Sequence, residues 1–141
     1  NWLDVLEAFA KYNANVLPVL DENNIYIGYY ELIDIMNLFK ETPFLNEPGG
    51  ILIIEKGNID YSFSEISQIV ESNDGKLLGA FISDEEGDVT QITLKLGTSG
   101  LNNIIQAFRR YSYNIIAGNE EDSYIEALKD RSNYLDKFLK I

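Results

Sequence analysis

Apolar residues at helical spacing predict a helix at the start of the chain, over residues 1–14. Asn1 is a suitable N-cap, because its side-chain oxygen can accept hydrogen bonds from backbone amides that the first turn leaves unpaired. The residues expected on the inward face are Trp2, Leu6, Phe9 and Ala10.

A β-hairpin and a second helix are predicted next. Residues 16–20 and 25–30 are short apolar runs separated by the polar sequence Asp-Glu-Asn-Asn, a combination typical of two strands joined by a turn. Pro18 has no backbone N–H to donate to a ladder, so its strand either lies at a sheet edge or leaves one ladder donor absent. A helix is predicted over residues 31–40, with Leu32, Ile33, Met36 and Phe39 facing inward.

Residues 42–50 are predicted to be a linker between two modules. This segment contains two prolines and two glycines, and neither a helix nor a central strand tolerates that composition well. The chain therefore divides into a first module over residues 1–41 and a second over residues 51–119.

Residues 51–119 show the order strand-helix-strand-strand-helix-strand, which is the ferredoxin-like split βαββαβ arrangement. The acidic sequence over residues 83–88 is predicted as the turn of its central hairpin. The expected strands are residues 51–55, 77–82, 89–96 and 113–117, with helices capped by Ser62 or Ser64 and entered after Gly100. The expected core residues are Phe63, Ile66, Ile69, Val70, Ile92, Leu94, Leu96, Leu101, Ile104, Ile105 and Phe108.

The C-terminal residues 120–141 are predicted to form an amphipathic packing helix. A four-stranded sheet with helices on one face leaves an edge and a face to be covered, and two-fold pairing is the commonest way to cover them. We therefore expect a homodimer held by residues 51–119 and the tail; the alternative is that the tail folds back on its own domain in a monomer. The apolar stripe of the tail consists of Tyr124, Leu128, Leu135, Phe138 and Leu139.

Charge and composition exclude several classes of function. The net charge of −12 is unsuited to nucleic acid or an anionic membrane surface, and no apolar run is long enough to span a bilayer. The chain has no Cys and no His, which removes thiol and imidazole catalysis and the usual zinc ligands. We predict no enzyme, metal or cofactor, although carboxylates and tyrosines leave acid–base chemistry open. The absence of Cys is in keeping with a cytoplasmic protein.

The first module resembles a CBS motif, the unit named after cystathionine β-synthase. The resemblance is carried by Val16-Leu17-Pro18-Val19, Asp21, Tyr26-Ile27-Gly28-Tyr29-Tyr30 and Asp34. It implies an α-β-β-α half of a paired fold, whose cleft commonly binds adenosyl nucleotides. The partner motif would lie upstream of Asn1 or come from another chain. The implied nucleotide-binding residues are Val16, Pro18, Tyr30, Glu31 and Asp34.

Two of these residues leave alternatives open. Asp34 could accept hydrogen bonds from ribose hydroxyls, or it could be a first-turn acid favoured by the helix dipole. Glu31 stands where the family has Ser or Thr in contact with phosphate, and its negative charge would repel that group. The resemblance therefore implies a neutral or cationic adenosyl ligand rather than a polyphosphate.

The second module looks like an ACT domain, a small-molecule regulatory module of amino-acid metabolism. The resemblance is carried by Ile51-Leu52-Ile53-Ile54, by residues 60–66 and by Asn73-Asp74-Gly75. It implies an amino-acid site in the loop that enters the first helix, although Ser62 or Phe63 stands where the family usually has Gly. Turn or cap chemistry accounts equally well for Asp60. The implied ligand residues are Asn58, Asp60, Tyr61 and Ser62.

A CBS segment followed by an ACT segment is the order seen in acetoin-utilisation AcuB-like regulatory proteins. The resemblance implies a non-enzymatic α+β protein that senses a small metabolite and transmits the result through dimer geometry or to a protein partner. The alternative is a dimerisation or protein-interaction module that has lost ligand binding.

Overall fold

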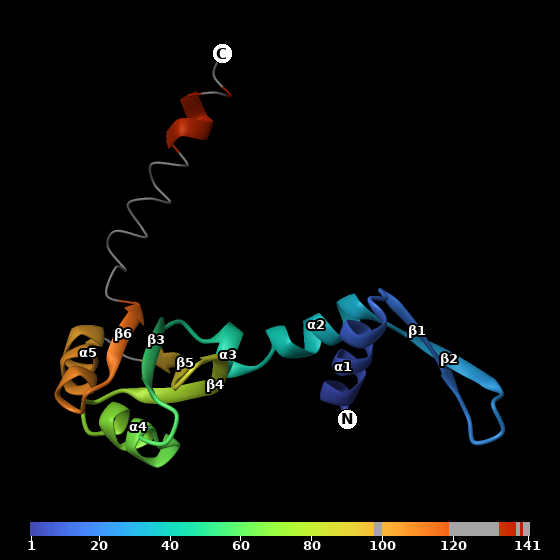
Figure 1. The fold of residues 1–141 in the computed structure, drawn as a ribbon. Coiled ribbons are helices and arrows are strands. Elements are labelled where there is room, and N and C mark those ends of the chain that lie inside the picture. The colour runs from blue at the N-terminus through green and yellow to red at the C-terminus, as the bar shows by residue number, and fades with distance from the viewer. Residues whose placement is uncertain (98–99, 119–132, 138, 140–141) are drawn as a thin grey trace. The chain divides into compact units, whose positions relative to one another are not determined.

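The computed structural model describes residues 1–97, 100–118, 133–137 and 139, and it contains two compact units. Unit 1 is Asn1–Pro48 and unit 2 is Gly49–Ile141. Helices and antiparallel strands occur in both, which confirms the α+β class (Figure 1). The division between the units falls within the segment predicted as a linker.

Unit 1 is an α-β-β-α arrangement followed by one further helical turn. Asn1 caps the first helix, because its Oδ1 accepts the backbone N–H groups of Leu3 at 2.8 Å and Asp4 at 3.3 Å. Phe9 is buried on this helix, whereas the predicted inward residue Ala10 is exposed. The elements are α1 (Trp2–Tyr12), β1 (Val16–Leu20), β2 (Tyr26–Glu31), α2 (Leu32–Lys40) and α3 (Pro43–Asn46).

Strands β1 and β2 form a two-stranded antiparallel sheet, in which both strands are edges. Of the two alternatives given for Pro18, the structure shows the edge position, and this residue lies opposite Tyr29. Asp21 shapes the turn, because its Oδ1 accepts the N–H groups of Asn23 at 2.8 Å and Ile25 at 2.9 Å. The hairpin is therefore defined by local hydrogen bonds.

The inward face predicted for α2 is wrong for Ile33 and Met36 and omits Ile35. Leu32 and Phe39 do lie on the packed side. Ile35 is the buried residue, whereas Ile33 and Met36 are each 55% exposed. At 3.6 residues per turn, Ile35 shares a helix face with Leu32 and Phe39, and that face packs towards α1. The contact includes the rings of Trp2 and Phe39, whose centroids are 6.0 Å apart.

The predicted linker is more ordered than its composition indicates. Pro43 occupies the first turn of α3, a position where its missing N–H costs no hydrogen bond. The ring of Phe44 stacks on that of Phe39, with centroids 5.8 Å apart. At the other end of the segment, Gly50 already belongs to the first strand of unit 2.

Unit 2 is built on a four-stranded antiparallel sheet with the strand order β4-β5-β3-β6. The order of elements along the chain is the predicted βαββαβ, so this part of the prediction is confirmed. The elements are β3 (Gly50–Gly57), α4 (Phe63–Glu71), β4 (Lys76–Glu86), β5 (Val89–Gly97), α5 (Leu101–Arg110) and β6 (Asn114–Ala117).

The core of unit 2 lies between one sheet face and the helices α4 and α5. Burial alternates along β5, as its sequence predicts, with every second residue from Thr90 to Leu96 inaccessible to solvent. Phe63 is an exception among the predicted core residues, because it is 41% exposed at the start of α4. The buried cluster is Leu52, Ile54, Ile66, Ile69, Val70, Ile92, Leu94, Leu96, Ile104, Ile105, Ala107, Phe108 and Tyr113.

The acidic turn predicted over residues 83–88 is wrong in extent. Strand β4 continues to Glu86, which pairs with Val89, and Asp84 pairs with Gln91. Only Gly87 and Asp88 form the turn, and Gly87 has φ +60°, as a tight II′-type hairpin requires at its first position. Ladder hydrogen bonds therefore extend through a sequence whose composition is typical of a loop.

Most of the predicted C-terminal helix, including Tyr124, Leu128 and Phe138, lies outside the described residues. Residues 133–137 are helical, and the side chains of Leu135 and Leu139 are 56% and 78% exposed. Within the described ranges, no helix is both long and apolar enough to cross a membrane.

Candidate functional site

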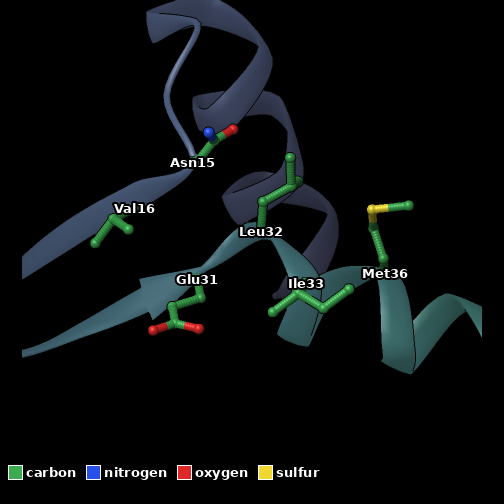
Figure 2. A pocket seen from close by; sticks show the side chains of 6 residues that line it. All are labelled: Asn15, Val16, Glu31, Leu32, Ile33 and Met36. Atoms are coloured by element: carbon green, nitrogen blue, oxygen red, sulfur yellow. The ribbon is translucent and has the colours of Figure 1, made fainter.

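A hollow of about 350 Å³ lies where the hairpin of unit 1 meets α2 (Figure 2). Two contacts shape it: Val16 and Glu31 are cross-strand partners, and the backbone N–H of Leu32 donates to the carbonyl of Asn15 at 2.8 Å. We call it the α2 hollow. It is lined by Asn15, Val16, Glu31, Leu32, Ile33 and Met36.

The α2 hollow combines apolar walls with one carboxylate. Glu31 is the N-cap residue of α2, but its side chain makes no capping hydrogen bond. Within the part of the chain that the structure describes, its carboxylate has no hydrogen bond or ion pair, and no Lys or Arg lines the hollow. Glu31 is therefore available to a ligand that carries hydrogen-bond donors or positive charge.

A second hollow, of about 370 Å³, lies between α1 and the hairpin. It is lined mainly by Asp4, Val5 and Ala8 of α1 and by the β1 strand, with Tyr30 from β2. The predicted nucleotide-binding residues are thus divided between two places. Val16 and Glu31 line the α2 hollow, Pro18 and Tyr30 line the second hollow, and Asp34 lines neither.

Asp34 lies in the first turn of α2 and is exposed. It forms no hydrogen bond or ion pair with any residue that the structure describes, so it is not a capping residue in the hydrogen-bonding sense. Its position is nevertheless favourable, because a negative charge in a first turn interacts well with the helix dipole.

The loop predicted as an amino-acid site in unit 2 is largely committed to its own structure, and Asn58 is the clearest case. Its Oδ1 accepts the Thr90 hydroxyl at 2.6 Å, and its Nδ2 donates to the Gly87 carbonyl at 3.0 Å. Its backbone N–H donates to Asp88 at 2.8 Å. Asn58 therefore fastens this loop to the β4–β5 turn and satisfies the buried hydroxyl of Thr90.

The other three residues of this loop differ in availability. Ser62 caps α4, because its Oγ accepts the N–H of Glu65 at 3.4 Å. Tyr61 packs against the core, with its ring centroid 6.0 Å from that of Phe63 in an edge-on contact. Asp60 is exposed, and its side chain has no hydrogen bond or ion pair among the described residues. Asp60 is therefore the residue of this set that is free to meet a ligand.

Sequence reasoning missed a polar cluster beside this loop. The hydroxyl of Tyr113 donates to Glu65 Oε1 at 2.9 Å, and the same oxygen accepts Lys56 Nζ at 3.3 Å. Lys56 Nζ also donates to the Tyr111 carbonyl at 2.9 Å and lies 4.3 Å from the centre of the Tyr113 ring. Lys56 lies in β3, Glu65 in α4 and Tyr113 just before β6, so the three residues are far apart in the sequence and no local pattern indicates the cluster.

The cluster ties the start of α4 to β3, through Lys56, and to the segment just before the edge strand β6, through Tyr113. The backbone N–H of Ser62 points to the Tyr113 hydroxyl at 3.5 Å, which adds a link to the predicted ligand loop. Burial and the hydrogen bond to Glu65 raise the pKa of Tyr113 to about 12. Tyr113 is therefore a neutral hydrogen-bond donor at physiological pH, and the cluster acts as a fastening of the loop.

No group of three or more His, Cys, Asp or Glu side chains with metal-binding geometry occurs in residues 1–97, 100–118, 133–137 and 139. The acids from Asp84 to Glu86 lie along an extended strand, where successive side chains point to opposite faces. That arrangement separates carboxylates that a calcium loop would bring together.

Comparison with known proteins gives little guidance. No family model matches this chain, and no curated protein matches it. Among solved structures it is similar to the crystal structure of protein BT0572 from Bacteroides thetaiotaomicron, with 12% sequence identity and a TM-score of 0.39. That match covers 84% of this chain and 83% of the other. A similarity of this size carries no argument about fold or function.

Proposed function

We propose that this protein is a cytoplasmic, non-enzymatic regulator that senses a small metabolite in the α2 hollow of unit 1. The observation that carries the proposal is that Val16 and Glu31 line one hollow, together with the apolar side chains of Leu32, Ile33 and Met36. Apolar walls with a few polar groups are typical of small-molecule sites. The resemblance to a CBS motif supplies the ligand class, an adenosyl nucleotide.

The chemistry of the hollow favours a neutral or cationic adenosyl compound. The purine ring would lie against the apolar walls, and the carboxylate of Glu31 would accept hydrogen bonds from amine or hydroxyl groups. A phosphate would be repelled, because two negative charges at short range inside a half-buried site are poorly screened. S-adenosylmethionine or adenosine would therefore bind better than ATP.

A thermal-shift screen of the whole chain with adenosine, AMP, ATP and S-adenosylmethionine tests this proposal. A ligand present at about 100 times its dissociation constant stabilises the folded state by about 2.7 kcal/mol. Glu31→Gln should weaken the shift given by S-adenosylmethionine, whereas Glu22→Gln, in the hairpin turn outside both hollows, should not. If none of the four compounds moves the melting temperature, the proposal fails.

A second substitution isolates the charge of Glu31. Glu31→Thr removes the carboxylate and provides the hydroxyl that the CBS pattern has at this position. We expect it to tighten ATP more than adenosine, because only ATP carries the phosphates that the carboxylate repels. Equal changes for both ligands would show that repulsion at Glu31 is not the cause.

For unit 2 we propose an amino-acid site that depends on a single side chain, Asp60. An ACT-type amino-acid site would have to use the carboxylate of Asp60 for the ammonium group, since Asn58 and Ser62 are engaged in fastening and capping. Glycine, serine, valine and the remaining common amino acids belong in the same thermal-shift screen. Loss of any such shift in Asp60→Asn would support this site, and its persistence would remove Asp60 from it.

The alternative function is a dimerisation module that has lost ligand binding. It is favoured by the large apolar side chains that unit 1 exposes, among them Ile27 at 64% and Tyr29 at 56%. A homodimer held by unit 2 and the C-terminal tail is part of either proposal. Light scattering on the full chain and on a chain ending at Asn119 measures it, and a monomeric mass for the full chain would contradict it.

A further inference from the structure

The α2 hollow is surrounded by apolar side chains that lie in water. Three of them line the hollow directly. Two more lie on the same side of β2 as Glu31, because alternate residues of a strand share one sheet face. We call this surface the hollow rim; it consists of Val16, Ile27, Tyr29, Ile33 and Met36, which are between 53% and 64% exposed beside the residues that the structure describes.

Glu31 brings a negative charge into the hollow rim. It is half-buried, and Figure 2 shows its side chain on the same side of the hairpin as that of Val16. Its carboxylate has no hydrogen bond or ion pair with the described residues, and no Lys or Arg lines the hollow. A carboxylate that is partly withdrawn from water is unfavourable until a cation or a hydrogen-bond donor meets it. The rim therefore joins apolar contact area to an unsatisfied negative charge.

We propose that the hollow rim is the docking surface for a basic amphipathic helix of a partner protein. Apolar side chains along one stripe of that helix cover the rim, and a Lys or Arg beside the stripe reaches the carboxylate of Glu31. The helix and the metabolite then compete for this carboxylate, so the metabolite releases the partner. The competition rests on the proposed function, whereas the docking does not.

The charges of the protein select a basic partner. Unit 1 carries eight acidic and two basic side chains, which gives it a net charge of −6. A field of this sign repels an acidic protein, including a second copy of this chain, and attracts a basic segment. In the whole chain 23 acidic residues outnumber 11 basic residues, so the basic helix must come from another protein.

The area of the hollow rim fits a transient complex. A half-exposed side chain of Tyr or Ile size leaves on the order of 100 Å² in water, so the five side chains leave about 500 Å². Apolar patches of about 300–600 Å² on a monomer are often functional. Interfaces that bury less than about 1,200 Å² in total belong to weak and transient complexes. We therefore expect a dissociation constant of the order of micromolar, which suits release by a metabolite.

Fluorescence anisotropy of a labelled synthetic peptide, titrated with the full chain, tests the docking. The probe is a helix of about four turns with leucine along one stripe and lysine elsewhere. Tyr29→Ser and Glu31→Gln should each weaken its binding by about fivefold or more. The matched controls Tyr12→Ser and Glu22→Gln should leave binding unchanged, because Tyr12 and Glu22 line neither hollow. Added salt should weaken binding, since it screens the charge attraction.

Two results would overturn the docking. The first is equal binding of the probe to the parent chain and to all four variants, which would show attraction to net charge alone. The second is a dimer of the chain, seen by light scattering without peptide, that Tyr29→Ser abolishes and Tyr12→Ser preserves; it would assign the hollow rim to a second copy. A peptide with glutamate in place of lysine should not bind, and equal binding of both peptides would remove Glu31 from the interaction.

S-adenosylmethionine, added to the complex of the chain with the lysine peptide, tests the competition. At about ten times its own dissociation constant it should raise the apparent dissociation constant of the peptide about tenfold. If it stabilises the chain in the thermal-shift screen but leaves peptide binding unchanged, the competition is wrong and the proposed function stands. If it does not bind the chain at all, the proposed ligand fails, and the docking is judged by the peptide and its variants alone.

Discussion

The two units differ in where their apolar side chains lie. Unit 2 buries thirteen residues in one continuous cluster between its sheet and two helices. Unit 1 buries two large apolar side chains, Phe9 and Ile35, and leaves most of its remaining aliphatic and aromatic residues in water. Both units contain helices and antiparallel strands. The difference arises because unit 2 has a four-stranded sheet large enough to bury a core under two helices, whereas unit 1 has only a two-stranded hairpin.

In unit 2 the apolar side chains mainly stabilise the fold, whereas in unit 1 many of them remain on the surface. A two-stranded hairpin is marginal by itself and needs a helix on one face, which α1 and α2 supply. The other face of the hairpin leaves apolar side chains exposed, among them Ile27 at 64% and Tyr29 at 56%. In unit 2, by contrast, the loop residues Asn58 and Ser62 form hydrogen bonds that stabilise the fold itself. The same contrast explains why the candidate ligand site falls in the smaller unit.

The largest expected effect is in the core of unit 2. Phe108 is completely buried, and its ring packs edge-on against Tyr113 with centroids 5.4 Å apart. Phe108→Ala should lower the free energy of unfolding of unit 2 by about 3–5 kcal/mol. Urea unfolding followed by circular dichroism measures it. The fluorescence of Trp2, the single tryptophan and a residue of unit 1, should keep its midpoint; a joint shift would show that the units unfold together.

The matching substitution in unit 1 is Ile35→Ala. Ile35 is 2% exposed, so we expect a loss of about 2–4 kcal/mol for unit 1. Here the Trp2 fluorescence transition should move, because Trp2 packs on Phe39 of the same helix as Ile35. Met36→Ala, on the exposed side of α2, is the control and should change the midpoint little in dilute protein. An equal loss in both variants would contradict the assignment of the inward face.

A smaller effect is expected from Tyr113→Phe. This change removes the hydrogen bond to the Glu65 carboxylate and should destabilise unit 2 by about 1–3 kcal/mol at neutral pH. The pKa of Tyr113 is raised to about 12 in the folded state, above the ordinary value of 10.0. Its contribution to stability is therefore complete below pH 10 and is lost as the pH rises from 10 through 12.

Urea midpoints at pH 9 and pH 11 measure this dependence. The parent protein should lose more stability between these two pH values than Tyr113→Phe, which has no phenol to ionise. Parallel losses would assign the pH effect to other groups.

The smallest effect compares two glycines, one in each unit. Gly87 has φ +60° in the β4–β5 turn, so Gly87→Ala should cost about 1 kcal/mol. Gly28 lies in β2 with ordinary extended geometry, and an added Cβ there would meet no atom within 4 Å. Gly28→Ala should therefore be neutral or slightly stabilising. Thermal melts of the two variants test the difference, and a larger loss in Gly28→Ala would reverse it.

Strong periodicity made much of unit 2 predictable. The alternation along β5 and the helical spacing in α5 each indicate one element and one inward face, and both are observed. In α2, six of the nine residues are apolar, so apolar positions occupy most of the helix circumference and the pattern does not select a side. Only the contact with α1 decides that Ile35 is buried and Ile33 is not.

The candidate sites were predictable to a smaller degree. Pairing of Val16 with Glu31 follows from the hairpin register, so the sequence could anticipate that these two residues line one hollow. The engagement of Asn58 does not follow, because its partner Thr90 is 32 residues away and only tertiary folding brings them together. Likewise, the acids of residues 84–86 resemble a loop by composition, and the ladder with β5 overrides that preference.

The long strand β4 has a further consequence, for behaviour at high concentration. It is an edge of its sheet, eleven residues long, and exposes Phe81 and Ile82. Such an edge is a template for uncontrolled strand addition and fibrous aggregation. Two register shifts interrupt its regularity, and Asp84, Glu85 and Glu86 bring like charges to its end. The repulsion between these acids on neighbouring molecules opposes strand addition at this edge. Neutralising them should therefore lower the concentration at which the protein precipitates.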